Sequence, residues 1–203
     1  MKNEERIKMS LRDNTRKLFA KTLKEMLREM PMEKVRVNEL CRRCGADRQT
    51  FYYHFRDKYD LATWIFAKDY ESVLSDTDGQ YTIEHAAAIL RRMQDDKQFY
   101  RKVFSDRSQN AISAYIYDYF VTLGTDAVRH SFGDNALDIY TVYEIKSHSF
   151  ACVGHTMEWL EGRSEYTPEE FARLQYQFMP LLLKRAYGIV DIQDQFASPD
   201  SPT

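Results

Sequence analysis

The residues with the clearest chemical potential lie in the segment 48–54, which reads RQTFYYH. Arginine and glutamine can form paired hydrogen bonds with the edges of bases, hydroxyl groups can bind phosphates, and aromatic rings can lie against sugars. A helix that only filled a protein core would have little use for so many polar side chains within seven residues. The segment is therefore typical of a helix that enters the major groove of DNA.

Such a helix needs a partner that holds it at the protein surface. The sequence predicts a preceding helix over about 38–44, which Gly45 ends, and Asp47 can cap the helix that follows. Leu40 and Phe51 are the apolar residues that would pack the two helices together. Two short helices joined by a glycine-containing turn predict a helix-turn-helix.

Charge is distributed unevenly along the chain. Residues 1–58 contain 16 Lys and Arg against 9 Asp and Glu, a net charge of +7, whereas the remaining residues contain 13 against 22, a net charge of −9. A basic first quarter followed by an acidic remainder is expected when one end of a protein binds nucleic acid. The alternative, a chance clustering of solvated charges, would give the same numbers.

The composition favours an all-α protein. The 203 residues are 43% hydrophobic, so a core can form, and only seven glycines and five prolines argue against a fold rich in β-turns. Apolar residues recur at three- and four-residue steps through about nine helices, and no strand is convincing. We expect a helix-turn-helix DNA-binding domain over 1–57, a helical dimerisation and effector domain over 58–190, and a flexible tail over 191–203.

Capping residues and helix breakers set the expected ends of several helices. Ser10 resembles the cap of the first helix, and Pro31 marks its end. The polar stretch 75–80 is the best candidate for a boundary turn. Thr167 is followed by proline and two glutamates, which is a strong helix start, and Pro180 should kink or break the helix that follows.

Nothing in the sequence predicts a membrane span or secretion. No stretch approaches 18 consecutive apolar residues, and the first residues lack the apolar block of a signal peptide. Three cysteines, an odd number, fit a reducing compartment better than a disulfide framework. We therefore expect a cytoplasmic protein with no membrane partner.

The helix-turn-helix region resembles one family of regulators. Residues 50–58 (TFYYHFRDK) are similar to the T-[ILF]-Y-x-H-F-x-[DN]-K signature of tetracycline-repressor (TetR)-type regulators, and residues 39–45 (ELCRRCG) to their E-[IL]-A-x-x-A-G, with cysteine replacing both alanines. The resemblance covers about residues 10–65. The region 154–171 looks like the subgroup that includes activators of dihydroxyacetone kinase operons, although this resemblance is weaker.

The resemblance implies DNA contacts for eight residues: Arg36, Arg48, Gln49, Thr50, Tyr52, Tyr53, His54 and Lys58. Arg48 and Gln49 match positions that read bases, and Lys58 matches a phosphate-binding lysine that opens the fourth helix. The other hydroxyl, imidazole and aromatic groups match contacts to phosphates, sugars and the groove wall. Arg36 departs from the family pattern, which has Ser or Thr at this cap; it can hold a phosphate electrostatically but weakens the cap. The alternative is a set of surface polar residues without such a role.

Catalytic and metal-binding patterns are absent from the sequence. Cys41 and Cys44 lie three residues apart, but no second cysteine or histidine pair follows at zinc-finger spacing, so small packed side chains are the favoured interpretation over zinc. No glycine-rich phosphate loop and no activated nucleophile motif occurs. We expect no metal, no cofactor and no enzymatic activity.

Aromatic residues are concentrated in the second half of the chain. Six residues could line an aromatic ligand pocket between helices: Tyr100, Phe104, Tyr115, Tyr119, His148 and Phe150. The same residues could equally fill the core, with tyrosine hydroxyls at the surface.

Dimerisation is expected through the last two long helices. The region from about 136 to 161 is apolar or small around most of its circumference, and a second copy could bury the surplus in a four-helix bundle. The expected interface residues are Val153, Thr156, Met157, Leu160, Phe171, Leu174 and Phe178. The alternative is that this helix is central and enclosed within one subunit.

The resemblance implies a homodimeric transcription regulator whose partner is double-stranded DNA with a palindromic operator. The favoured interpretation is a repressor that an unknown effector releases from this operator. Two alternatives stay open. One is an activator controlled by a protein coregulator instead of a small molecule, and the other is a helical dimerisation scaffold that no longer binds DNA.

Overall fold

The computed structural model describes residues 2–74, 82–105 and 112–188, and in these ranges it contains helices and no strand. The ten α-helices are α1 (Lys2–Glu29), α2 (Val37–Cys44), α3 (Arg48–His54), α4 (Lys58–Leu74), α5 (Ile83–Asp95), α6 (Lys97–Phe104), α7 (Ile112–Phe132), α8 (Ile139–Leu160), α9 (Pro168–Gln177) and α10 (Leu181–Ala186). Two 3₁₀ turns, η1 (Met32–Lys34) and η2 (Asp134–Ala136), complete the described elements. The expected all-α fold is confirmed.

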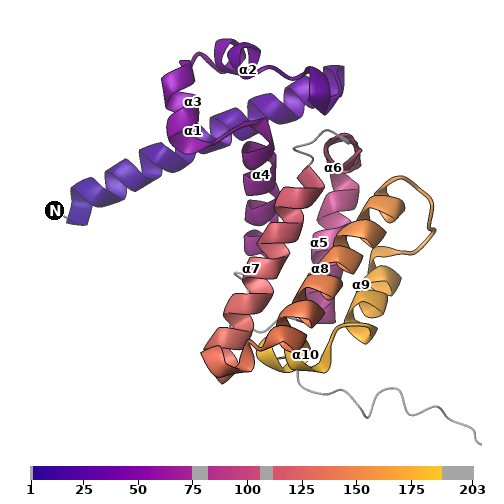
Figure 1. Cartoon of the computed structure of the whole chain (residues 1–203). Helices are drawn as coiled ribbons and strands as arrows, with labels where there is room; N and C mark the ends of the chain where they lie inside the picture. Colours follow the sequence, from indigo (N-terminus) through magenta and orange to yellow (C-terminus); the bar gives the residue numbers. More distant parts are fainter. Residues whose placement is uncertain (1, 75–81, 106–111, 189–203) are drawn as a thin grey trace, which may run out of the picture.

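The first three helices form a head at one end of the molecule (Figure 1). Phe19 of α1, Leu40 of α2 and Phe51 of α3 are fully buried, and the rings of Phe19 and Phe51 meet edge to face with centroids 5.3 Å apart. Because Phe51 is the one fully buried residue of α3, its packing on Phe19 and Leu40 fixes which face of α3 is left exposed. The sequence prediction that Leu40 and Phe51 pack the two short helices together is confirmed.

The turn between α2 and α3 has the expected chemistry. Gly45 follows α2 with φ = 68°, a left-handed conformation that glycine adopts without the strain a Cβ would cause. The side chain of Asp47 accepts a hydrogen bond from the backbone N–H of Thr50, with a distance of 2.6 Å, and so caps α3. The turn therefore holds α3 at a defined angle to α2.

Helices α4 to α10 form a bundle below the head (Figure 1). In this bundle α5 packs against α9, and α7 packs against α4, α8 and α10. Gly124 permits the closest approach, since a Cβ at this position would lie 3.0 Å from Cγ2 of Ile145 in α8 and 3.4 Å from Cδ2 of Leu183 in α10. A larger residue there would require the side chains of Ile145 and Leu183 to shift.

Three expected helix ends need comment. Ser10 lies inside α1, because the helix already begins at Lys2, so the expected start at Ser10 is wrong. Thr167 caps α9 as expected, in a reciprocal capping box with Glu170. Pro180 breaks the last helix into α9 and α10, because proline supplies no N–H to continue it; the described residues thus hold ten helices instead of nine. The proposed turn at 75–80 and tail at 191–203 lie outside the described residues.

Asp69 of α4 ties the head to the bundle. Its carboxylate, 13% exposed, accepts a 2.6 Å hydrogen bond from the hydroxyl of Tyr100 in α6 and a 2.8 Å one from Arg92 in α5. The ammonium of Lys24 in α1 lies 3.9 Å from the same carboxylate. Elements from both ends of the molecule therefore meet at one nearly buried charge.

None of the described helices is long and apolar enough to cross a membrane.

Candidate nucleic-acid interface

Helix α3 presents the expected side chains outward. Arg48, Gln49, Tyr52 and Tyr53 are exposed, Tyr53 by 67%, while Phe51 is the one fully buried residue of this helix. The guanidinium of Arg48 lies 5.6 Å from the centroid of the Tyr52 ring. The exposed face thus combines a fork of donors, an amide and two flat rings, the set that base edges and sugars require.

The remaining α3 positions are closer to the protein. Thr50 and His54 are half-buried, and Nδ1 of His54 is buried without a hydrogen-bond partner. Burial and the nearby guanidinium groups of Arg16 and Arg12 lower the pKa of His54. The imidazole therefore favours its neutral form, and because Nδ1 is buried, only Nε2 is left to contact DNA.

The basic residues of α2 are engaged within the protein. Glu39 accepts hydrogen bonds of 2.7 and 2.8 Å from Arg42 and one of 2.8 Å from Arg43. These bonds lower the pKa of Glu39 to about 2. Arg36 and Arg48, in contrast, have no carboxylate within 4 Å among the described residues. Their charges are therefore free to meet phosphates or bases.

Arg36 stands at the start of α2, as the sequence predicted. Its backbone is extended, and its side chain makes no capping hydrogen bond. The first N–H groups of α2 therefore lack the side-chain acceptor that Ser or Thr would provide, and they are directed at whatever lies in front of the helix. Arg36 itself is exposed.

Lys58 makes contacts within the protein that the sequence did not predict. Its ammonium donates to the carbonyl oxygens of Met32 at 2.6 Å, of Glu33 at 3.1 Å and of Val35 at 3.1 Å. An ammonium group has three donors, and these bonds direct all three toward the η1 segment. The phosphate contact of Lys58 stays a prediction, while these bonds show that its ammonium is engaged within the protein. Lys58 thus joins the start of α4 to the turn that precedes α2.

The cysteines of α2 behave as packing residues. Cys41 is buried and Cys44 is half-buried, with its thiol 3.5 Å from the carbonyl oxygen of Cys41. Burial raises the pKa of both thiols, so they stay protonated at neutral pH. In the described part of the chain no three His, Cys, Asp or Glu residues gather as a metal site would require.

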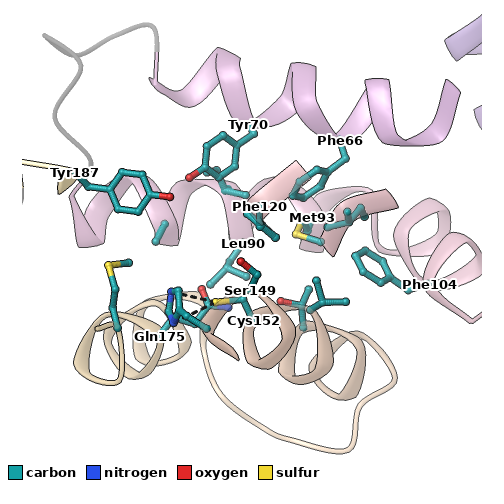
Figure 2. Close-up of a pocket in the computed structure, with 17 residues that line it drawn as sticks. Phe66, Tyr70, Leu90, Met93, Phe104, Phe120, Ser149, Cys152, Gln175 and Tyr187 are labelled. Atoms are coloured by element: carbon teal, nitrogen blue, oxygen red, sulfur yellow. Dashed lines mark hydrogen bonds between the residues drawn. The ribbon is translucent and has the colours of Figure 1, made fainter. Parts of the chain in front are cut away.

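The bundle contains a small internal cavity of about 70 Å³ (Figure 2). Phe66 and Tyr70 of α4 and Phe120 of α7 cover one side, while Ser149 and Cys152 of α8 lie on the other. The sequence did not single these residues out. Phe66 and Tyr70 are spaced one helical turn apart on α4, which could have indicated a shared cavity wall. The same spacing is equally typical of residues in a hydrophobic core.

The six expected pocket residues do not gather in one place. Phe104 and His148 line the cavity. The hydroxyls of Tyr100 and Tyr115 instead donate to Asp69 and Asp57, at 2.6 and 2.9 Å. The other two are placed differently again: the Tyr119 ring packs against those of Phe66 and Tyr70, and Phe150 is 74% exposed on the outer face of α8. The predicted aromatic wall is therefore wrong as a single set.

A larger open groove of about 660 Å³ runs between α8 and α9. Tyr143, Ser147 and His155 line it from α8, and Leu174 lines it from α9, with Phe178 directly after that helix. His148 and Cys152 line both hollows. The Cys152 Sγ lies 3.5 Å from Nε2 of His148, and burial raises the pKa of this thiol to about 12.

The expected dimer residues divide into two groups. Val153, Thr156, Leu160 and Phe171 are buried within their own chain, and Thr156, only 8% exposed, lines the internal cavity. The other three are more accessible: Met157 and Leu174 are half-buried and Phe178 is 75% exposed. The first group cannot form a seam between subunits, because its surface is already covered. The apolar outer face of α8 consists of Ile139, Tyr140, Tyr143 and Phe150 instead.

A helix-turn-helix head on a helical bundle defines a class of DNA-binding regulators. Residues 13–63 match the family described as bacterial regulatory proteins, tetR family, and residues 81–180 match the transcriptional regulator C-terminal region of this group. The chain belongs to the tetR family of transcriptional regulators. A protein of this family is a transcription regulator and not an enzyme.

One relative is similar in sequence, and one solved structure is similar in fold. The HTH-type dhaKLM operon transcriptional activator DhaS of Lactococcus lactis subsp. lactis (strain IL1403) is 30% identical over 91 residues, which are 44% of this chain. The match spans about half of that relative, 49% of its length. The solved structure of a dihydroxyacetone kinase operon activator DhaS is similar in fold, with a TM-score of 0.53 at 20% identity over 85% of this chain and 96% of that one.

The role of Lys58 can be tested by Lys58→Met. The change keeps the aliphatic stem but leaves three carbonyls without their donor, so we expect the free energy of unfolding to fall by about 1–3 kcal/mol. Urea denaturation measures this loss, and Lys21→Met, at an exposed position of α1, is the control that should change little. Unchanged stability together with a weaker salt dependence of DNA binding would support the phosphate role.

His148 should make the stability of the bundle depend on pH. Burial, and less strongly the charge of Lys184, lowers the pKa of His148 from 6.5 to about 4. The unfolded chain takes up this proton near pH 6.5 and the folded chain only near pH 4, so the free energy of unfolding should decrease as pH falls through this window. Denaturation of His148→Gln at pH 7 and pH 5 should show a smaller decrease than the wild type. A control variant at exposed His130, His130→Gln, should keep the full decrease; equal slopes in all three proteins would contradict the assignment.

Proposed function

We propose that this chain acts as a homodimeric regulator that reads a palindromic operator, with α3 of each copy in one major groove. The observation that carries this proposal is the exposed face of α3, on which Arg48 has no carboxylate partner among the described residues. The two copies would place their recognition helices about one helical turn or slightly more apart. We retain 1–57 as the DNA-binding part and 58–190 as the part that dimerises and receives the signal, and the cytoplasm as the site of action.

We infer that its regulation is positive and depends on a macromolecular partner. The relative that is 30% identical is named as an operon transcriptional activator, and the C-terminal part of this chain carries the weaker resemblance to that subgroup. The internal cavity of about 70 Å³ is smaller than the roughly 300–1,000 Å³ of typical small-molecule sites. The open groove of about 660 Å³ between α8 and α9 could admit side chains of another protein, but its volume lies inside the small-molecule range and does not by itself favour a macromolecule.

A repressor that a small effector releases is the second candidate. The observation in its favour is the polar lining of the cavity, where Ser149, Gln175 and Tyr187 bring hydrogen-bonding groups into an otherwise apolar space (Figure 2). Transcription from a target promoter, compared with and without this protein, distinguishes the two candidates. Activation supports the first, and repression relieved by a metabolite supports the second.

The base-reading role of α3 predicts the effect of Arg48→Ala. Loss of the guanidinium should lower specific affinity for a duplex selected by the wild-type protein by about 1–3 kcal/mol and relax base preference at one position of each half-site. Fluorescence anisotropy with single-base variants of the duplex measures both effects. Arg101→Ala, on the exposed side of α6, is the matched control and should change neither. Unaltered affinity and preference in Arg48→Ala would show that α3 does not read this groove.

The outer face of α8 is proposed as the dimer seam. Phe150 is exposed there beside Gly154, where an added Cβ would meet no atom of its own chain within 4 Å, while Tyr143 and Ser147 lie where this face meets the groove between α8 and α9. Exposed rings next to small residues suit a self-complementary interface, in which the rings of one copy fill the space over the small residues of the other.

Phe150→Glu tests this seam without disturbing the core. The residue is 74% exposed, so the chain should fold, while like charges across a two-fold axis should give a monomer. Light scattering measures the mass, and circular dichroism confirms folding. Phe132→Glu, at an exposed aromatic position near the end of α7, is the control that should stay dimeric. A monomeric wild type, or a dimeric Phe150→Glu variant, would contradict this interface.

A further inference from the structure

Helix α1 is longer than the family domain requires. It begins at Lys2, whereas the match to the tetR family begins at residue 13. Figure 1 shows the first half of α1 continuing past α3, away from the rest of the head. The residues 2–11 contain three basic and two acidic side chains. At 1.5 Å per residue, these ten residues extend the helix by roughly 15 Å.

Arg12 lies where this extension leaves the head. Its guanidinium is 5.2 Å from the centroid of the Tyr53 ring, and Tyr53 is one of the exposed residues of α3. Arg12 is itself exposed and has no carboxylate within 4 Å among the described residues. A guanidinium held beside a groove-wall tyrosine can form a paired, charge-assisted bond with a phosphate.

A second cationic group stands behind Arg12. The guanidinium of Arg16 lies 5.9 Å from the ring of Phe55 and 6.0 Å from that of Trp64, and its Nε is buried without a hydrogen-bond partner. Nδ1 of His54 is likewise buried and unpartnered. Two guanidinium groups thus lie near the end of α3, beside a neutral imidazole, and neither has a carboxylate within 4 Å among the described residues. These positive charges attract an anion from outside the protein.

Several other basic groups of the head, unlike Arg36 and Arg48, are already bound within the protein. The three donors of Lys58 are directed at carbonyls, and Arg42 and Arg43 bond to Glu39. Near the end of α3, we therefore expect Arg12 to bind the phosphate that the family motif would assign to a lysine.

We propose that Arg12 binds a DNA phosphate beside the half-site and that the N-terminal turns of α1 lie along the flanking DNA. This inference rests on the proposed DNA-binding function. It adds a second, sequence-independent contact surface outside the groove that α3 reads. Since 15 Å corresponds to roughly four base pairs, the contact would widen each half-site by about that amount.

The test compares two duplexes that carry the same half-sites, selected by the full-length protein from a random-sequence pool. One duplex ends at the half-site edges, and the other continues for six further base pairs on each side. The wild type should bind the longer duplex at least fivefold more tightly at moderate salt, because only that duplex supplies the flanking phosphates. Arg12→Ala and Arg12→Gln should lose this preference.

The salt dependence supplies the second readout. Loss of one phosphate contact per subunit should reduce the slope of log affinity against log salt by about 0.9 per contact, so by nearly two for a dimer. Lys21→Ala, farther along α1 and 76% exposed, is the control that should keep both the preference and the slope. Thermal unfolding monitored by circular dichroism shows whether each variant retains its fold.

Each outcome is decisive. A wild type without preference for the longer duplex, or an Arg12→Ala variant with unaltered preference and slope, overturns the inference while the proposed function stands. A wild type that selects no duplex overturns both. Loss of the preference in both Arg12 variants, with the Lys21 control unchanged, supports the contact.

Discussion

The junction at the start of α4 is the constraint on which the rest of the structure depends. The ammonium of Lys58 binds three carbonyl oxygens of the segment between α1 and α2, and the neighbouring Asp57 accepts hydrogen bonds from the backbone N–H groups of Tyr59 and Asp60. Asp57 also accepts a bond from the hydroxyl of Tyr115 in α7. Two adjacent residues of opposite charge thus hold the head, α4 and the bundle in one arrangement. A movement of α7 that displaces the Tyr115 hydroxyl would therefore change the contacts that hold α2 and α3 in place.

The contacts between the head and the bundle indicate where a regulatory signal can act. The Tyr115–Asp57 contact and the Asp69 cluster join the head to the bundle at two separate points along α4. A ligand or partner changes DNA affinity only if it binds one arrangement of these contacts better than another. The internal cavity and the open groove share His148 and Cys152, so an event in either hollow has a short physical route to the other through α8.

Features set by neighbouring residues were predictable from the sequence, and features set by distant ones were not. The cap of α3 at Asp47, the end of α2 at Gly45 and the packing of Leu40 on Phe51 follow from local spacing. Lys58 was assigned to a phosphate from the family resemblance, and its bonds to carbonyl groups were not foreseen because these partners lie 23 to 26 residues earlier in the chain, beyond any local pattern. Thr156 was assigned to a dimer seam because an all-round apolar helix does not reveal which side its own domain covers, and the structure buries that side. The exposure of Phe150 has the same origin.

The most direct test of the account is selection of DNA by the full-length protein from a random-sequence pool, followed by sequencing of the bound fraction. A dimer with one recognition helix per subunit predicts enrichment of an inverted repeat, with half-site centres about one helical turn or slightly more apart. Enrichment of sequences without two-fold symmetry, or no enrichment over the starting pool, would contradict it.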